Sequence, residues 1–274
     1  MKKILNLKDS NSIKTSRFSG GECHVKLLTN FNENDEIEIL ARINSADDLM
    51  YLLLANDALR QSGITSISAF IPYFPYARQD RVMVPGEPLS IKVFASIINS
   101  ANFKKVSVYD AHSDVTPALL DRCIHIKNHD MVRHFIEKLQ ITDYLLVSPD
   151  LGAYKKTDKL AASLGYTDKI ITGIKIRDLS TGNIIKSDIN ENNLQNKNCI
   201  VVDDICDGGR TFIELASVLK NKGANKLYLM ISHGIFSHNA IENLIAAGYE
   251  VICCTNSVSD REESSFFHQF NLFN

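Results

Sequence analysis

Residues 199–212 read CIVVDDICDGGRTF, and this stretch holds the pattern that decides the fold. A β-rich apolar run ends in Asp203 and Asp204, a short turn with Asp207 and two glycines follows, and Thr211 opens a run of helical period. In open parallel α/β sheets, ligands bind at turns of this kind, where a strand ends and a helix begins. The stretch therefore predicts an α/β domain with a ligand site at this turn.

The composition of the turn suits a sugar phosphate. Gly208 and Gly209 allow the backbone to approach a ligand closely, and successive N–H groups with the following helix N-terminus attract a phosphate dianion. The carboxylates just before the glycines can hold ribose hydroxyls or a metal ion. The alternative is a capped turn with solvated acidic side chains.

Strand and helix patterns alternate along the rest of the chain. β-rich runs such as 37–43 and 66–72 are each followed by a run of helical period, which predicts parallel sheets flanked by helices. The 274 residues correspond to about two domains. We place the division at the polar stretch 127–130, which gives domains 1–127 and 128–274.

Two local patterns give finer expectations. Ser45 followed by Asp48 resembles a capping box and predicts a helix that begins at Ala46. The most polar stretch, 178–195, predicts a projecting hairpin with its turn at 180–183.

Composition excludes several classes of protein. The chain has 30 Lys and Arg against 32 Asp and Glu, so no basic excess favours a nucleic-acid partner. No apolar run reaches the roughly 18 residues of a membrane-spanning helix, and the apolar start is too short for a signal peptide. We expect neither nucleic acid nor membrane as a partner, and a cytoplasmic location.

The six cysteines are scattered without the spacing of a zinc site, so we expect reduced, mostly buried thiols. A zinc site from Cys253, Cys254, His233 and His238 is the alternative. It is disfavoured because adjacent cysteines on a strand point to opposite faces.

Basic residues and a histidine form three further motifs. In YFPYARQDR (73–81), Arg78 and Arg81 lie beside aromatic residues, which suits a planar base and a polyphosphate, with a surface role as the alternative. In YDAHSD (109–114), His112 follows a strand end beside Asp110 and Asp114. It is a candidate metal ligand or nucleotide contact, although a lone histidine is more often structural.

Lys175 and Arg177 form the third motif. They alternate with apolar residues, so both point the same way from an extended strand. A solvated strand face is the alternative to a binding role.

Together with EPLSIK (87–92), LLVSPDLG (145–152) and SHGIFS (232–237), these motifs resemble the ribose-phosphate diphosphokinase family. The turn at 199–212 resembles the ribose-phosphate loop of type I phosphoribosyltransferases. The resemblance implies two tandem type I phosphoribosyltransferase-like, or Rossmann-like, domains. It also implies transfer of the β,γ-diphosphoryl group of ATP to the C1 hydroxyl of ribose 5-phosphate, which gives phosphoribosyl pyrophosphate and AMP.

The resemblance also implies roles on the ATP side. Arg78, Gln79 and His112 match residues that contact ATP. Phe18 and Glu22 match a motif through which a neighbouring subunit packs on the adenine, so the family relationship implies a homo-oligomer, at least a dimer.

On the acceptor side the resemblance implies a Mg²⁺ site and three binding elements. His112, Asp150 and, more weakly, Asp110 match the metal site, and Asp150, Leu151 and Gly152 match the pyrophosphate loop. Lys175 and Arg177 match the two basic residues of the catalytic loop. The ribose 5-phosphate loop corresponds to Asp203, Asp204, Asp207, Gly208, Gly209, Arg210 and Thr211.

The chain departs from the family pattern at several positions. The family has a polar residue where this chain has Gly20, and commonly has Arg where this chain has Gly86. Ala153 replaces the second Gly of the pyrophosphate loop, and Arg210 replaces a Gly of the ribose-phosphate loop. We also expect a short form without the usual C-terminal segment. A type I phosphoribosyltransferase and an inactive regulatory homologue are the competing functional interpretations.

Overall fold

The structure is a computed structural model that describes residues 1–177 and 184–273. It describes the backbone alone for two short stretches, residues 175–177 and 184–186. The chain divides into two compact units. The first comprises residues 1–127 with Leu272 and Phe273, and the second comprises residues 128–271.

The last residues therefore belong to the first unit, whereas the sequence placed them in the second domain. The ring of Phe273 lies 6.0 Å from the ring of Phe70 and 4.5 Å from the guanidinium carbon of Arg42. Aromatic packing and a cation–π contact explain this placement, which no periodic pattern in the sequence could indicate.

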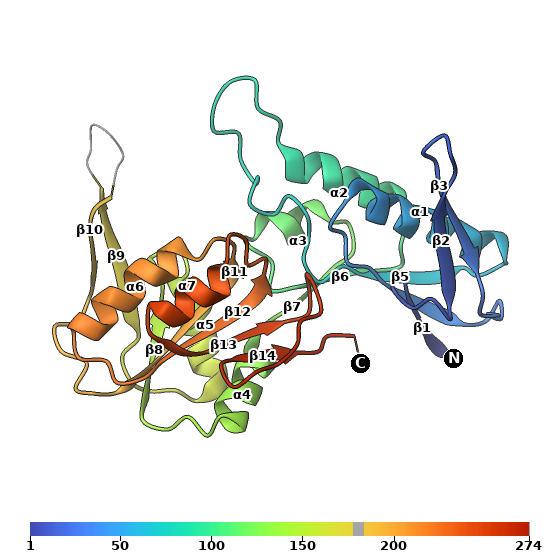
Figure 1. Ribbon diagram of the computed structural model, residues 1–274. Helices are drawn as coiled ribbons and strands as arrows, with labels where there is room; N and C mark the ends of the chain where they lie inside the picture. The colour runs from blue at the N-terminus through green and yellow to red at the C-terminus, as the bar shows by residue number, and fades with distance from the viewer. Residues whose placement is uncertain (178–183, 274) are drawn as a thin grey trace. The chain divides into compact units, whose positions relative to one another are not determined.

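The first unit is built on a five-stranded parallel sheet in the order β1-β4-β5-β6-β7. Its strands are β1 (Lys2–Asn6), β4 (Glu36–Leu40), β5 (Ser66–Phe70), β6 (Val106–Tyr109) and β7 (Cys123–Ile126). The connections from β4 onward contain α1 (Ala46–Gln61), α2 (Ser90–Ser100) and α3 (Val115–Leu119). From β4 to β7, each connection leads to the next strand on the same side of the sheet. Right-handed crossovers in one direction place α1 and α2 on the same face of the sheet (Figure 1).

A hairpin of β2 (Ile13–Arg17) and β3 (Cys23–Leu27) forms a separate antiparallel pair, and β3 packs against α1. Helix α1 begins as the capping pattern predicts, because the Ser45 side chain accepts a 3.2 Å hydrogen bond from the backbone N–H of Asp48. Its apolar face joins a buried core with the sheet, in which Leu52 and Leu59 are fully buried.

The second unit contains a seven-stranded sheet in the order β10-β9-β8-β11-β12-β13-β14. Its strands are β8 (Tyr144–Ser148), β9 (Ile171–Arg177), β10 (Ile184–Ile189), β11 (Asn198–Cys206), β12 (Leu227–Gly234), β13 (Tyr249–Thr255) and β14 (Phe267–Phe270). The pairs are parallel except for β9 with β10. Its helices are α4 (His129–Lys138), α5 (Tyr154–Leu164), α6 (Arg210–Asn221) and α7 (Ala240–Ala246).

The centre of this sheet is a topological switch point. Strands β8 and β11 are parallel neighbours, but the chain leaves β8 through α5 toward β9 and leaves β11 through α6 toward β12. Right-handed crossovers in opposite directions place α5 on one face and the contacting pair α6 and α7 on the other (Figure 1). The crevice outside the carboxyl ends of β8 and β11 is where such sheets bind ligands.

The predicted α/β class, with parallel sheets flanked by helices, is confirmed. Strands β9 and β10 pair antiparallel on either side of the hairpin turn predicted at 180–183, and that turn lies outside the described residues. Within the described part of the chain, none of the helices has the length and apolar character needed to cross a membrane.

Candidate functional site

A cavity of about 620 Å³ opens in the first unit at the carboxyl ends of the neighbouring strands β5 and β6. Most of its lining comes from the connection between β5 and α2, and His112 comes from the connection after β6. The lining residues are Arg78, Gln79, Asp80, Arg81, Met83, Glu87, Pro88 and His112. The structure therefore brings Arg78, Gln79 and His112 to one cavity, while the predicted adenine contacts Phe18 and Glu22 are not among its lining residues.

A buried carboxylate organises the basic groups of this cavity. The Asp80 side chain is only 5% exposed and accepts a 3.0 Å hydrogen bond from Nε of Arg81. That hydrogen bond, helped by the Ser113 hydroxyl and the proximity of His112, holds the pKa of Asp80 below its usual value. Arg81 is thus oriented by its neighbour although its own side chain is 72% exposed, and Arg78 and Gln79 are exposed as well.

The rim of the cavity is held by Glu87. Its carboxylate accepts hydrogen bonds from the backbone N–H groups of Met83 (3.2 Å) and Val84 (3.3 Å), which closes a tight loop. Gly86, where the family commonly has Arg, adopts φ of 94° in this loop, a conformation that favours glycine.

Asp110, the weaker metal candidate, is buried with 3% of its surface exposed. It adopts φ of 36°, and its backbone N–H donates a 2.7 Å hydrogen bond to the carbonyl of Ile126. The cavity lining includes His112 but not Asp110. The structure therefore separates the environments of these two candidates.

The predicted subunit-contact residues lie at the turn between β2 and β3. Phe18 is 61% exposed, and its N–H donates to the carbonyl of Glu22 at 2.9 Å. A Cβ on Gly20 would lie 2.6 Å from a carboxylate oxygen of Glu22, so the glycine makes room for that side chain. Phe18 is thus presented on the surface by a closed hairpin.

In the second unit, the acidic turn at the end of β11 is held by contacts from two other segments. The Ser237 hydroxyl donates a 2.6 Å hydrogen bond to Oδ1 of Asp207. Gly209 is the N-cap of α6 and has φ of 77°, a left-handed conformation that glycine adopts without the strain that a Cβ atom would cause. Gly208 could accept a Cβ without a clash, since the nearest atom, Ser237 Oγ, would lie at an ordinary contact distance of 3.8 Å.

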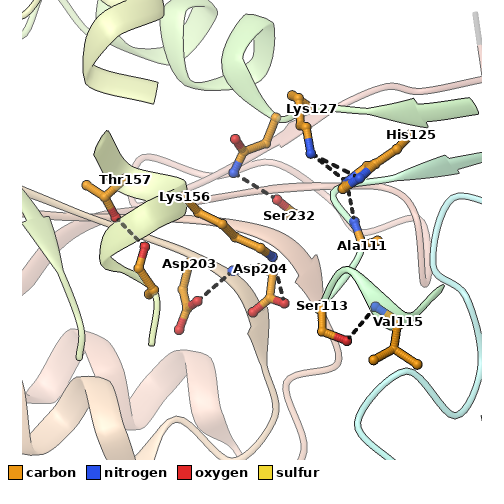
Figure 2. A network of polar contacts seen from close by, with 12 residues as sticks. Ala111, Ser113, Val115, His125, Lys127, Lys156, Thr157, Asp203, Asp204 and Ser232 are labelled. Atoms are coloured by element: carbon orange, nitrogen blue, oxygen red, sulfur yellow. Dashed lines mark hydrogen bonds and ion pairs between the residues drawn. The ribbon is translucent and has the colours of Figure 1, made fainter. Parts of the chain in front are cut away.

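Lys156, on α5, reaches the same turn. Its Nζ lies 3.1 Å from Oδ2 of Asp204, whose side chain is 8% exposed, and the Asp204 N–H donates to Oδ1 of Asp203 at 2.8 Å (Figure 2). Burial, and then the adjacent Asp204 carboxylate, raise the pKa of Asp203 well above its usual value. Two carboxylates and one ammonium group therefore share the site.

Arg210 forms an ion pair within its own helix. Its side chain is 87% exposed, and Nε donates a 2.9 Å hydrogen bond to Glu214 one helical turn further along α6. Thr211 follows it in the first turn of the helix.

The predicted pyrophosphate loop lies at the carboxyl end of β8. Oδ1 of Asp150 accepts a 3.0 Å hydrogen bond from the N–H of Ala153, and the Ser148 hydroxyl donates to the Asp150 carbonyl at 2.7 Å. Leu151 and Gly152 are exposed between them. Ala153 has φ of −80°, so alanine is unstrained at the position where the family has glycine.

Lys175 and Arg177 lie on β9, as the alternating pattern predicts, and their side chains are outside the described part of the structure. The strand approaches the pyrophosphate loop closely at Gly173. A Cβ there would lie 2.2 Å from the carbonyl oxygen of Pro149, so only glycine allows this approach. Backbone packing thus connects the strand of the two basic residues to the Asp150 loop.

Among the described residues, no group of three or more His, Cys, Asp or Glu side chains has the arrangement of a metal site. The six thiols are free, and burial raises the pKa of Cys199, Cys206 and Cys254 to about 12.

Sequence reasoning missed three residues of these sites: Asp80, Lys156 and Ser237. Asp80 stood inside a quoted motif, so its carboxylate between two arginines was a usable signal. Lys156 and Ser237 reach the acidic turn from segments 48 and 30 residues away. No local pattern marks Lys156, and Ser237 ends the quoted stretch 232–237 without having been given a role.

Comparisons with known proteins identify the family. A model of the N-terminal domain of ribose phosphate pyrophosphokinase matches residues 2–101, and a model of the phosphoribosyl synthetase-associated domain matches residues 191–269. The ribose-phosphate pyrophosphokinase of Mycoplasma genitalium is 32% identical over 249 residues, which cover 89% of this chain and 73% of the relative. That of Cereibacter sphaeroides is 33% identical over 258 residues, with the same coverages of 89% and 73%.

The fold has a close counterpart among solved structures. The crystal structure of phosphoribosylpyrophosphate synthetase from Mycobacterium smegmatis matches with a TM-score of 0.84 at 22% identity, over 99% of this chain and 94% of that one. At this identity the likeness shows the fold, while the sequence relatives and the family models show the family. The resemblance seen in the motifs is confirmed, and the chain belongs to the ribose-phosphate pyrophosphokinase family.

Proposed function

We propose that this chain is a ribose-phosphate diphosphokinase, which transfers the β,γ-diphosphoryl group of ATP to the C1 hydroxyl of ribose 5-phosphate. The main support is that the chain has two different sites. One is an acidic, glycine-containing turn at a switch point of the second sheet, and the other is a cavity of the first unit lined by two arginines and a histidine. Family membership supports the same activity. The products are phosphoribosyl pyrophosphate and AMP.

The turn between β11 and α6 is the proposed acceptor site. Backbone N–H groups at Gly208 and Gly209, with the N-terminal end of the α6 dipole, suit the 5-phosphate, and Thr211 adds a hydroxyl. The carboxylates of Asp203 and Asp204 suit the ribose hydroxyls, which donate hydrogen bonds. Asp207, held by Ser237, sets the shape of the turn.

The cavity of the first unit is the proposed ATP site. Arg78 and Arg81 both line the cavity, and guanidinium groups bind phosphate oxygens through pairs of N–H donors. Gln79 and His112 complete the polar lining, and both can hydrogen-bond to the nucleotide.

We propose that the chain holds Mg²⁺ through one or two of the predicted residues, Asp150 and His112 first, with the buried Asp110 as the weaker candidate. The donor chemistry fits, because Mg²⁺ in phosphoryl-transfer sites is held by one or two carboxylates together with substrate phosphates and waters. A cluster of three protein ligands is therefore not required. When bound, the ion neutralises charge on the phosphate oxygens.

Chemistry requires the C1 hydroxyl oxygen to attack the β-phosphorus. The new bond joins this oxygen to phosphorus, the hydroxyl proton is lost, and AMP leaves with the oxygen that bridged the α- and β-phosphorus atoms. A loose transition state of this kind needs alignment and positive charge more than a protein nucleophile. Lys175 and Arg177 are the residues that we assign to neutralising charge on the transferred group.

We further propose that the site is completed in an oligomer. An exposed Phe18 at the tip of a closed hairpin suits stacking on the adenine of a neighbouring subunit, with Glu22 beside it. The cytoplasmic location expected from the sequence stays a prediction, which fractionation of the source cells would test.

The direct test is to incubate the pure protein with Mg²⁺, ATP and ribose 5-phosphate, and to follow the products by ³¹P NMR. We expect AMP and a diphosphate ester at C1, and no AMP when ribose 5-phosphate or Mg²⁺ is omitted. ATP binding without AMP formation would instead identify an inactive regulatory homologue. Base transfer from added phosphoribosyl pyrophosphate, without AMP formation from ATP, would identify a phosphoribosyltransferase.

A further inference from the structure

An ion pair connects the two predicted phosphate-binding loops of the second unit. Lys156 is the third residue of α5, directly after the loop 150–152, and its ammonium group lies 3.1 Å from the Asp204 carboxylate at the end of β11. Figure 2 shows the lysine side chain extended from its helix toward Asp204. The contact spans 48 residues of sequence and the switch point between β8 and β11.

Burial makes this pair different from a surface salt bridge. The Asp204 side chain is 8% exposed and that of Lys156 36% exposed. Ion pairs between two exposed side chains contribute little, because water solvates both partners. Removing the cation from a nearly buried carboxylate costs much more, because water cannot replace the lost charge there.

The effect of the pair extends to the neighbouring carboxylate. The backbone N–H of Asp204 donates to Oδ1 of Asp203 at 2.8 Å, so the two carboxylates are neighbours at the end of β11, and the charge of Lys156 acts on both. Two adjacent carboxylates repel each other, and the single ammonium group reduces this repulsion. The edge that Asp203 and Asp204 present to a ligand therefore depends on a residue of another segment.

We propose that Lys156 is a positioning residue for the pentose phosphate, which holds the Asp204 carboxylate, and by its charge the adjacent Asp203 carboxylate, in the geometry that binds the sugar hydroxyls. This inference rests on the proposed function and deepens it. Lys156 acts through Asp204 and not on the reacting phosphates. The same contact ties the loop 150–152 to the acidic turn.

Three variants test the proposal. Lys156→Met removes the charge at similar size, Lys156→Arg keeps it, and Lys159→Met changes an exposed lysine of the same helix as a matched control. We expect Lys156→Met to raise the KM for ribose 5-phosphate about tenfold while the KM for ATP changes less than about twofold. Lys156→Arg should recover most of this loss, and Lys159→Met should resemble the wild type.

A double-mutant cycle with Asp204→Asn shows whether Lys156 works through Asp204. If it does, Lys156→Met adds no further rise in the KM for ribose 5-phosphate when Asp204 is already Asn. Full additivity of the two changes would overturn the proposal. So would a Lys156→Met variant whose kcat falls while its KM for ribose 5-phosphate is unchanged, since that result places Lys156 on the reacting groups.

Calorimetric titration of ribose 5-phosphate into the same variants separates this proposal from the proposed function. A wild type that binds ribose 5-phosphate but forms no AMP, with binding weakened about tenfold in Lys156→Met, would refute the function and support the positioning role. An active wild type with undiminished binding in Lys156→Met would refute the positioning role alone. Thermal unfolding of each variant checks that its fold is retained.

Discussion

The hydroxyl of Ser237 donates a 2.6 Å hydrogen bond to the carboxylate of Asp207 and so joins the segment after β12 to the turn after β11. Both segments lie at the carboxyl end of the second sheet, which is where the fold presents its ligand-binding loops. The turn proposed for ribose 5-phosphate is therefore shaped by a residue outside the motif itself.

Removing this hydroxyl should loosen the acceptor site. A hydrogen bond to a charged group contributes about 1.5–3 kcal/mol, so we expect Ser237→Ala to raise the KM for ribose 5-phosphate by about tenfold or more. Steady-state kinetics with ATP saturating measures this change. An unchanged KM would show that the turn holds its shape without Ser237.

The Asp203 carboxylate, next to that of Asp204, should make the protein less stable at neutral pH than a variant with a neutral side chain at position 203. Because the pKa of Asp203 is raised in the folded state, the folded protein binds more protons than the unfolded chain above the ordinary carboxyl pKa. Stability from this group is therefore lost as the pH rises through its folded pKa. We expect Asp203→Asn to increase the free energy of unfolding at pH 7, with a difference that vanishes near about pH 4.

Urea unfolding of the two proteins over this pH range measures the effect. A stabilising gap that stays constant with pH would contradict the assignment to the Asp203 ionisation. The same variant should bind ribose 5-phosphate less well, since an amide replaces a carboxylate acceptor.

The close approach at Gly173 gives a steric prediction. A methyl group there would lie 2.2 Å from the Pro149 carbonyl oxygen, so Gly173→Ala must displace backbone. We expect a loss of about 1–3 kcal/mol in stability and a lower kcat, because the strand that carries Lys175 moves relative to the Asp150 loop. Gly208→Ala, whose Cβ would meet no clash, is the matched control for stability. Equal unfolding midpoints for the two variants would be the contrary outcome.

The charge assigned to Lys175 has a kinetic signature. If this ammonium group neutralises charge that develops during transfer, Lys175→Ala should lower kcat far more than it weakens ATP binding. Single-turnover rates and equilibrium binding of ATP measure the two effects separately. Equal losses in both would count against a role in the transition state.

A mixing experiment tests completion of the adenine site by a neighbour. Phe18→Ala and Lys175→Ala would each impair activity through different residues, Phe18 on one subunit and Lys175 on the other. Oligomers reassembled from both variants should then contain some sites with both residues intact and regain activity. Mixtures no more active than the separate variants would place Phe18 in its own subunit's site.

Much of the fold could be predicted because buried strands and amphipathic helices leave periodic patterns. The helix that begins at Ala46 with its Ser45 cap is one example, and the runs 37–43 and 66–72, which contain most of strands β4 and β5, are others. The hairpin of β2 and β3 was missed because each strand has only five residues and most of its side chains are at least partly exposed. Edge strand β7 was missed because its four residues leave too short a pattern.

The candidate site could be predicted where function leaves a local motif. The turn 203–211 and the run 78–81 carry charge and glycine patterns that a fold alone does not require. Lys156 looks like any surface lysine of a helix, and only the tertiary structure brings it to Asp204. Residues that act through a partner far along the chain are invisible to spacing arguments.

The first turns of α5 and α6 have a consequence for the unliganded enzyme. Their N-cap residues are Ala153 and Gly209, which carry no polar side chain, whereas the structural helix α1 is capped by Ser45. An anionic substrate can supply the terminal acceptors that these residues lack. Bound substrate should thus slow amide hydrogen exchange in the first turns of both helices. The ligand then stabilises these helix ends in addition to taking part in the reaction.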